Sequence, residues 1–130
     1  EDVYTTNYSY KGGFLASMGD EEFSETYTWS NNNLTTIQEI YDGEIDETFA
    51  VAYSDIDNNT NIDFTIWLID EDPTALQQFI TNVSKKIPSS YTITEDGDTD
   101  KVEVTTSLDE KGRPAKMTAN GDTYTFEYYD

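Results

Sequence analysis

The sequence contains no cysteine and no histidine. Without cysteine the chain has no disulfide, no thiolate metal site and no cysteine nucleophile. Without histidine it lacks the commonest general base and zinc ligand. Two large classes of enzyme are therefore excluded, and the chain carries no sign of the redox compartment in which it resides.

Basic residues are also scarce, since 7 Lys and Arg stand against 27 Asp and Glu, for a net charge of −20. Nucleic acid and anionic lipid headgroups are bound by clustered Lys and Arg. We therefore expect no nucleic-acid partner and no direct binding of the domain to an anionic membrane. A charge of this size is typical of a soluble, monomeric, β-rich protein, and a bound cation or a basic partner is the alternative explanation.

Long apolar runs and signal-peptide patterns are missing as well, so the sequence predicts no membrane-spanning helix. Asn, Thr, Tyr and Asp are abundant, which fits an exported bacterial protein of the periplasm or cell surface. A length of 130 residues suits one domain, residues 1–130. Such a domain buries roughly two-thirds of its unfolded surface without help from disulfides or metals.

One pattern recurs along the chain: two aromatic residues spaced by two, a tight turn of Gly, Asn or Asp, and an apolar residue that opens the next strand. Tyr27 and Trp29 precede the turn Asn31–Asn33 in this way. Asp96-Gly97 and Asn120-Gly121, each between alternating runs, are the strongest short-range signals of a β-hairpin. We expect an α+β, mainly β fold: a highly twisted antiparallel meander of about ten strands, open or partly closed into a barrel.

One helix is expected within this series, over about Pro73–Lys85. Its apolar stripe should pack across the apolar face of the sheet, and the stripe consists of Leu76, Phe79, Ile80 and Val83. The preceding segment, Ile62–Ile69, is apolar on both faces from Phe64 onward. A run of this kind and length predicts a strand near the middle of the core.

The segment from Leu108 through Gly112 to Pro114, followed by Tyr124–Asp130, resembles the tyrosine-aspartate hairpin repeat of Rhs-type shell proteins, and so does Tyr27–Thr35. The chain departs from that repeat in having Leu108 and Trp29 in place of the tyrosine. The spread of hairpins around one helix is similar to the mature domains of small Bacteroidetes lipoproteins of unknown function. That resemblance implies a β-meander and a cell-envelope location, with a lipid anchor upstream on a cysteine that this chain lacks. It implies no catalytic, cofactor-binding or metal-binding residue.

Oxygen ligands alternate between residues 55 and 63, and this loop is the sharpest candidate for chemistry. Its candidate calcium ligands are Asp55, Asp57, Asn59 and Asp63. The loop is not an EF-hand, because it lacks a glycine at its sixth position and a bidentate Glu at its end. The alternative is a polar turn whose Asx side chains bond to the local backbone.

Acidic runs at Asp20–Glu22, Asp70–Asp72 and Glu95–Asp98 could supply a carboxylate pair for glycoside hydrolysis. That chemistry needs two carboxyl groups roughly 5 to 10 Å apart across a cleft, and the runs also fit solvated turns. A Ser or Thr nucleophile would need a lysine or a carboxylate as its base, because histidine is absent. We expect the chain not to be an enzyme.

The chain is rich in aromatic residues, with 10 Tyr, 6 Phe and 2 Trp. Aromatic residues on strands more often form core and cross-strand pairs, and we expect Trp29 and Trp67 to pack in this way. A stacking platform for sugars or peptides is the alternative. The sequence as a whole favours a non-enzymatic binding or structural module of an exported envelope protein, in contact with a glycan, peptide or protein. A carbohydrate-active enzyme with paired carboxylates and a calcium-stabilised adhesion module are the alternatives.

Overall fold

The computed structural model describes residues 6–69 and 76–129. Nine strands form one sheet in the order of the sequence, and each strand is antiparallel to the one before it. The elements are β1 (Asn7–Lys11), β2 (Phe14–Gly19), β3 (Phe23–Ser30), β4 (Asn33–Tyr41), β5 (Glu44–Asp57), α1 (Phe64–Ile69), β6 (Lys86–Glu95), β7 (Asp98–Leu108), β8 (Pro114–Ala119) and β9 (Asp122–Thr125). The expected twisted meander with one helix is therefore confirmed, and the sheet is not closed into a barrel.

The hairpins close through tight turns in the left-handed backbone region, as the turn residues predict. Asn31 and Asn32, between β3 and β4, have φ angles of 53° and 64°. The turns Asp42-Gly43, Asp96-Gly97 and Asn120-Gly121 also have positive φ at both positions. Asn, Asp and Gly tolerate this region, and the resulting turn matches the right-handed twist of the flanking strands.

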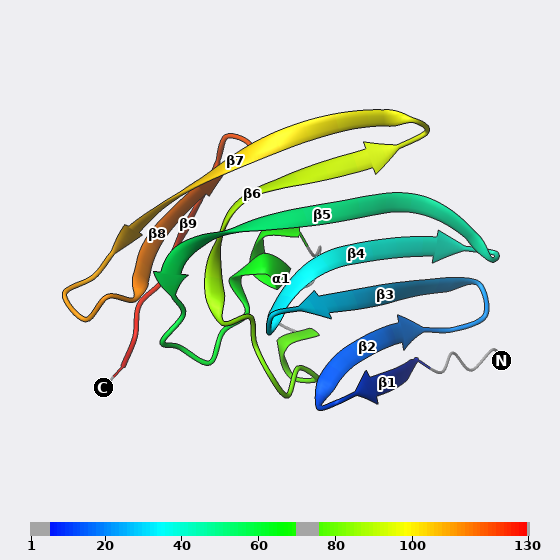
Figure 1. The fold of residues 1–130 in the computed structure, drawn as a ribbon, viewed down its shortest axis with the longest axis horizontal. Coiled ribbons are helices and arrows are strands. Elements are labelled where there is room, and N and C mark those ends of the chain that lie inside the picture. Colours follow the sequence, from blue (N-terminus) through cyan, green and yellow to red (C-terminus); the bar gives the residue numbers. More distant parts are fainter. Residues whose placement is uncertain (1–5, 70–75, 130) are drawn as a thin grey trace, which may run out of the picture.

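The long strand β7 changes partner halfway along, which accounts for the strong bend of the sheet in Figure 1. Its first half, residues 98–103, pairs with β6, and its second half, residues 104–108, pairs with β8. The sheet therefore curves around α1, which lies on one face of the sheet beside β5 and β6 (Figure 1).

A β-bulge in β4 keeps two large apolar residues on the same face. Thr28 pairs with Thr36 and Trp29 pairs with Leu34, so Thr35 has no partner in this register. Leu34 and Ile37 are consequently both directed into the core, at 0% and 2% exposure. The extra residue offsets the alternation that would otherwise place one of them in solvent.

The segment Ile62–Ile69 is not a strand, because α1 begins at Phe64. The backbone N–H groups of Thr65 and Ile66 donate to the Asp63 carboxylate, which caps the first turn of this helix. An apolar run buried on all sides fits a core helix as well as a central strand, so periodicity alone did not separate the two. The prediction of a strand here is wrong for this reason.

The predicted helix over Pro73–Lys85 is also misplaced. Its first residues, up to Ala75, lie outside the described residues; Leu76 and Gln77 are helical, and the chain then turns and runs irregularly to β6. Tertiary hydrogen bonds hold this irregular stretch, since Asn82 donates to the Gly13 carbonyl and Ser84 is bonded to Asp63. Of the expected stripe, Leu76 is buried, but Phe79 is 37% exposed and stacks on Tyr8.

The core surrounds α1. Phe64 and Ile66 are each 1% exposed, and Phe126, just past β9, meets the Phe64 ring edge-on at 5.0 Å between ring centroids. The Trp67 ring also meets Phe126 edge-on, at 5.9 Å. Aromatic contacts thus hold the helix against the segment that follows β9. Within the described part of the chain, no helix combines the length and apolar character that a membrane crossing requires.

Candidate functional site

A pocket of about 440 Å³ opens between β2 and β3 near the β3–β4 turn, and we call it the aromatic pocket. Its lining residues are Lys11, Phe14, Ala16, Tyr27, Thr28, Trp29, Asn31 and Asn32. Volumes of this order accommodate small ligands, and such sites combine aromatic walls with a few polar groups. The aromatic pocket has this composition.

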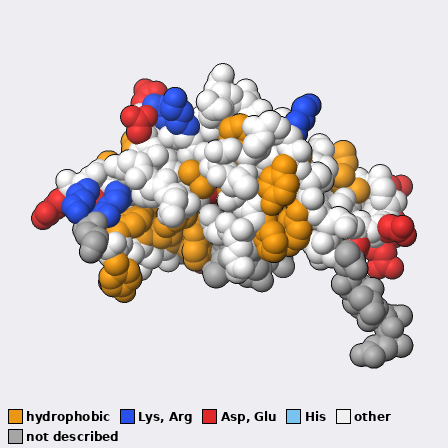
Figure 2. Space-filling view, turned by 90° about the horizontal axis from the view of Figure 1, so that it is seen from below, with side chains coloured by type: hydrophobic (Ala, Val, Ile, Leu, Met, Phe, Trp, Pro, Cys, Tyr) orange, Lys and Arg blue, Asp and Glu red, His pale blue; other side chains and the backbone are white. Residues whose placement is uncertain are grey.

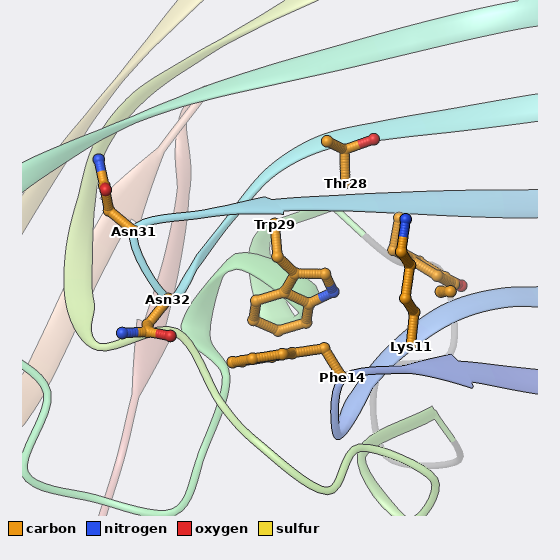
Figure 3. Close-up of a pocket in the computed structure, with 8 residues that line it drawn as sticks. Lys11, Phe14, Thr28, Trp29, Asn31 and Asn32 are labelled. Carbon is orange, nitrogen blue, oxygen red and sulfur yellow. The ribbon is translucent and has the colours of Figure 1, made fainter.

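Trp29 is fixed in the wall of the aromatic pocket by both its polar and its apolar parts. Its indole N–H donates to the carbonyl of Leu15 at 2.8 Å. Its ring packs against Phe14 with 4.8 Å between centroids and 38° between planes. Figure 3 shows the Trp29 ring beside Phe14, with Asn31 and Asn32 on one side and Lys11 on the other. The half-buried indole is therefore held in one orientation before any ligand arrives.

The β3–β4 turn presents two amide side chains beside the indole. Asn31 and Asn32 are both exposed, and within the described residues neither side-chain amide has a hydrogen-bond partner. An amide offers two donors and one acceptor carbonyl, so it can bond a ligand hydroxyl in either sense. The turn thus supplies polar groups whose hydrogen-bonding capacity is still available.

A second pocket of about 350 Å³ adjoins the first, since Phe14 and Asn32 line both of them. We call it the asparagine pocket, and its lining residues are Phe14, Asn32, Asn58, Asn82, Val83, Ser84 and Lys85. It is built by docking the β5–β6 connection onto the hairpin turns: Asn82 donates to Gly13 at 2.6 Å and the Lys85 N–H donates to Asn32 at 3.0 Å. A Cβ at Gly13 would lie 3.0 Å from the Asn82 amide nitrogen, which is too close for most side chains.

The structure does not bring the four candidate calcium ligands together. Asp57 forms an ion pair with Lys86 at 2.5 Å, and Asn59 donates to the carbonyl of Lys111 at 3.1 Å. Asp63 is 0% exposed beneath them, whereas Asp55 is exposed. Over residues 6–69 and 76–129, no group of three acidic side chains is arranged to hold a metal ion. The alternation in sequence serves local structure and tertiary contacts instead.

Asp63 is the centre of a buried hydrogen-bond network. Its second carboxylate oxygen accepts from the backbone N–H and the hydroxyl of Ser84, at 2.8 and 2.9 Å. Ser84 and Thr65 also contact the Tyr53 hydroxyl, which donates to the carbonyl of Leu34. Burial raises the pKa values of Asp63 and of Tyr53. Asp63 is 0% and Ser84 is 1% exposed, so this Asp–Ser–Tyr group joins α1 to the sheet from within the core.

A row of glutamates crosses the sheet, and the sequence spacing did not reveal it. In successive strand pairs Glu25 lies opposite Glu39, Glu39 opposite Glu47, and Glu47 opposite Glu95. Burial, with the neighbouring charges of Glu47, Glu25 and Asp46, raises the pKa of Glu39 from 4.5 to about 7. Hydrogen bonding to Glu47 and its charge raise the pKa of Glu95 as well. Neighbouring carboxylates repel each other when both are charged, so adjacent glutamates in the row tend to keep one proton between them.

Glu39→Gln is expected to stabilise the protein at pH 8. A carboxyl with a raised native pKa stabilises the fold below pH 4.5, and that contribution is lost as the pH rises through about 7. Gln keeps a hydrogen-bond donor toward Glu47 without the charge, and we expect it to add about 1 kcal/mol at pH 8, a figure reduced for the partial exposure of the site. Urea unfolding between pH 4 and 8 measures the effect.

The matched control for this pH effect is Glu110→Gln, in the exposed turn between β7 and β8. This substitution also removes one glutamate charge, at a position outside the glutamate row. It should leave the pH dependence of the unfolding free energy unchanged in shape. A Glu39→Gln protein that lost stability in parallel with the original chain between pH 5 and 7 would show that Glu39 is not the group that titrates there.

The acidic runs do not surround the aromatic pocket. Asp20 accepts hydrogen bonds from the N–H groups of Glu22 and Phe23 in the turn before β3, Asp96 forms the β6–β7 turn, and Asp70–Asp72 lie outside the described residues. Glu25 and Trp29 are four residues apart on β3, a rise of about 13 Å along a strand. The acid pairs Glu39–Glu47 and Glu47–Glu95, which are in hydrogen-bond contact, lie on β4, β5 and β6, and none of these strands contributes a described lining residue to the aromatic pocket.

The sequence identified the aromatic residues as a candidate platform, but it assigned Trp29 to the core. The structure gives Trp29 both roles, because it packs on Phe14 and lines the aromatic pocket. The strongest signal for the site was the asparagine run after Trp29, which we interpreted only as a turn. The asparagine pocket had no comparable signal, since its residues come from four separate segments.

Comparison with family models gives no match, and no curated protein sequence matches the chain. Two solved structures share its fold. A porin-like protein from Bacteroides vulgatus ATCC 8482 superposes with a TM-score of 0.62 and 14% identity, over 92% of this chain and 62% of that one. A porin-like protein from Bacteroides uniformis ATCC 8492 gives 0.64 and 14%, over 93% of this chain and 56% of that one. The chain thus spans less than two-thirds of either structure, and the likeness establishes the fold alone.

Proposed function

We propose that this chain is a non-enzymatic carbohydrate-binding module of an exported cell-envelope protein. The observation that carries the proposal is the fixed indole of Trp29 in a pocket walled by Phe14 and bordered by the free amides of Asn31 and Asn32. A sugar ring has an apolar face, which stacks on an aromatic ring, and hydroxyl groups around its edge, which bond to amides.

The fixed orientation of the pocket supports saccharide binding. Trp29 is oriented by its hydrogen bond to Leu15 and its contact with Phe14, so little freedom is lost when a ligand stacks on it. Asn31 and Asn32 lie in a two-residue turn whose positive φ angles fix the direction of their side chains. A linear apolar peptide would leave those amides without partners, which costs binding free energy.

An envelope location is part of the same proposal. The structural neighbours are porin-like proteins from Bacteroides, and this supports a module exported to the periplasm or the cell surface. The resemblance to Bacteroidetes lipoproteins, with a lipid anchor upstream of this domain, points in the same direction. Immunodetection on intact cells and in outer-membrane fractions tests the location independently of binding.

Fluorescence of single-tryptophan variants tests carbohydrate binding. Trp67→Phe leaves Trp29 as the one indole, and its emission should shift as saccharides of a glycan panel are titrated. Trp29→Phe leaves only Trp67, which packs on Phe126 outside the pocket, and its emission should stay constant. Loss of the Trp29 wall should weaken binding about tenfold or more, in the range of an aromatic hot spot.

Calorimetric titration of Asn31→Ala and Thr123→Ala separates the pocket from the rest of the surface. Asn31→Ala should lower the affinity for the saccharide found in the fluorescence test. Thr123→Ala, at an exposed position on β9, should leave that affinity unchanged. Equal effects of the two substitutions would contradict the location of the site. A panel in which no saccharide binds would contradict the function.

A further inference from the structure

The lining of the two pockets has a charge opposite to that of the protein. The chain carries 27 acidic and 7 basic side chains, yet among residues 6–69 and 76–129 no Asp or Glu lines either the aromatic pocket or the asparagine pocket. Each pocket is instead lined by one lysine, Lys11 in the first and Lys85 in the second. By contrast, a neighbouring hollow along β1 and β2 is lined by Asp20 and Glu21.

The two ammonium groups form no ion pair within residues 6–69 and 76–129. Lys86, the residue after Lys85, is in contact with Asp57 at 2.5 Å and is neutralised by it. Lys85 contributes to the lowered pKa of Asp57 only as the last of several causes, after the hydrogen bond and charge of Lys86. Lys11 and Lys85 therefore keep most of their charge available to a ligand.

Phe14 and Asn32 connect the two pockets, so a ligand of two or three sugar units in contact with Trp29 would lie between Lys11 and Lys85. In Figure 3 the Lys11 side chain extends along one flank of the indole. In Figure 2 the charged side chains of the visible face lie mainly along its outline, with uncharged and apolar groups across the middle. An anion in the two pockets would thus meet two lysines and no carboxylate among the described residues that line them.

We propose that the carbohydrate bound by this module is acidic, with a carboxylate or sulfate group on its rings that meets Lys11 and Lys85. The inference rests on the proposed carbohydrate binding and adds the chemical class of the saccharide. Charge-assisted bonds to a carboxylate or sulfate are shorter and stronger than bonds between neutral groups. They also select against neutral saccharides, because a neutral ring would leave both ammonium groups without a counter-charge.

Matched pairs of acidic and neutral oligosaccharides test the proposal by isothermal titration calorimetry. The carboxylate pair is trigalacturonate and its methyl ester, and the sulfate pair is a chondroitin sulfate tetrasaccharide and its desulfated form. We expect at least one acidic member to bind about tenfold more tightly than its neutral partner. Equal affinity within both pairs would overturn the inference, and binding of the neutral members that depends on Trp29 would still leave the proposed function intact. Absence of binding by all four would overturn both.

Lysine variants locate the charge. The double substitution Lys11→Gln and Lys85→Gln should lower affinity for the acidic oligosaccharide about tenfold and leave affinity for its neutral partner unchanged. Lys116→Gln, an exposed position on β8, removes the same charge far from the pockets and should have no effect. If the double variant binds the acidic member as tightly as the original chain, the anionic group meets other residues and the proposal is wrong. Unchanged thermal unfolding shows that the variants are folded.

Discussion

Asp63→Asn is expected to destabilise the protein by about 3 kcal/mol, the cost of leaving buried donors without their charged acceptor. The Asp63 carboxylate is 0% exposed and accepts bonds from Thr65, Ile66 and Ser84. An asparagine of the same size has one acceptor oxygen, and its amide would face either the helix N–H groups or the Ser84 N–H. Urea unfolding followed by circular dichroism measures the loss.

Asp57→Asn provides the matched control for this substitution. Asp57 lies in the same loop and pairs with Lys86, but 77% of its side chain is exposed. Exposed ion pairs contribute little to stability, so its unfolding midpoint should be close to that of the original chain. If Asp63→Asn unfolded at the same denaturant concentration as Asp57→Asn, the buried network would not hold α1 on the sheet.

Phe64→Ala is expected to cost about 3 to 5 kcal/mol, which is the usual range for removing a fully buried phenylalanine. Phe64 is 1% exposed at the start of α1, and its ring meets Phe126 edge-on. Its removal leaves a cavity in the core beside Phe126. The same unfolding assay gives the value, and the midpoint should fall without a large change in slope.

Phe79→Ala is the informative comparison, because sequence periodicity placed Phe79 in the core and the structure does not. Phe79 is 37% exposed, and its ring stacks on Tyr8 at 3.9 Å between centroids. We expect a loss of about 1 kcal/mol, the size of one aromatic contact. A loss equal to that of Phe64→Ala would restore the periodicity argument and contradict the packing described above.

The hairpins were predictable because their information is local. Asn31-Asn32, Asp96-Gly97 and Asn120-Gly121 favour a left-handed turn whatever the rest of the chain does, and each of them closes a hairpin. The β5–β6 connection was not predictable from the same kind of reasoning. Its conformation depends on bonds to Gly13, Asn32 and Leu34, which are about fifty to seventy residues away.

The glutamate row could not be predicted from the sequence, because a single-residue bulge determines which side chains lie opposite one another. The turn Asp42-Gly43 sets Tyr41 opposite Glu44, and a regular hairpin would then place Asp46 opposite Glu39. The register shifts after Ile40 pairs with Ile45, so Glu47 takes that position. Such a shift reverses the faces of all later side chains, and nothing in the local sequence specifies it. The aromatic pocket depends on a similar bulge, opposite Thr28 and Trp29.

The sequential order of the strands has a consequence for how the chain reaches its folded state. Each strand except β6 pairs with its predecessor across a short turn, so most of the sheet grows from local contacts, and such contacts form early. The β5–β6 connection must instead bind to hairpin turns more than fifty residues earlier in the chain. We expect this docking to be the slow step, because it closes a long loop. Because that docking completes the asparagine pocket, we expect a newly made chain to acquire its sheet first and its complete ligand-binding surface last.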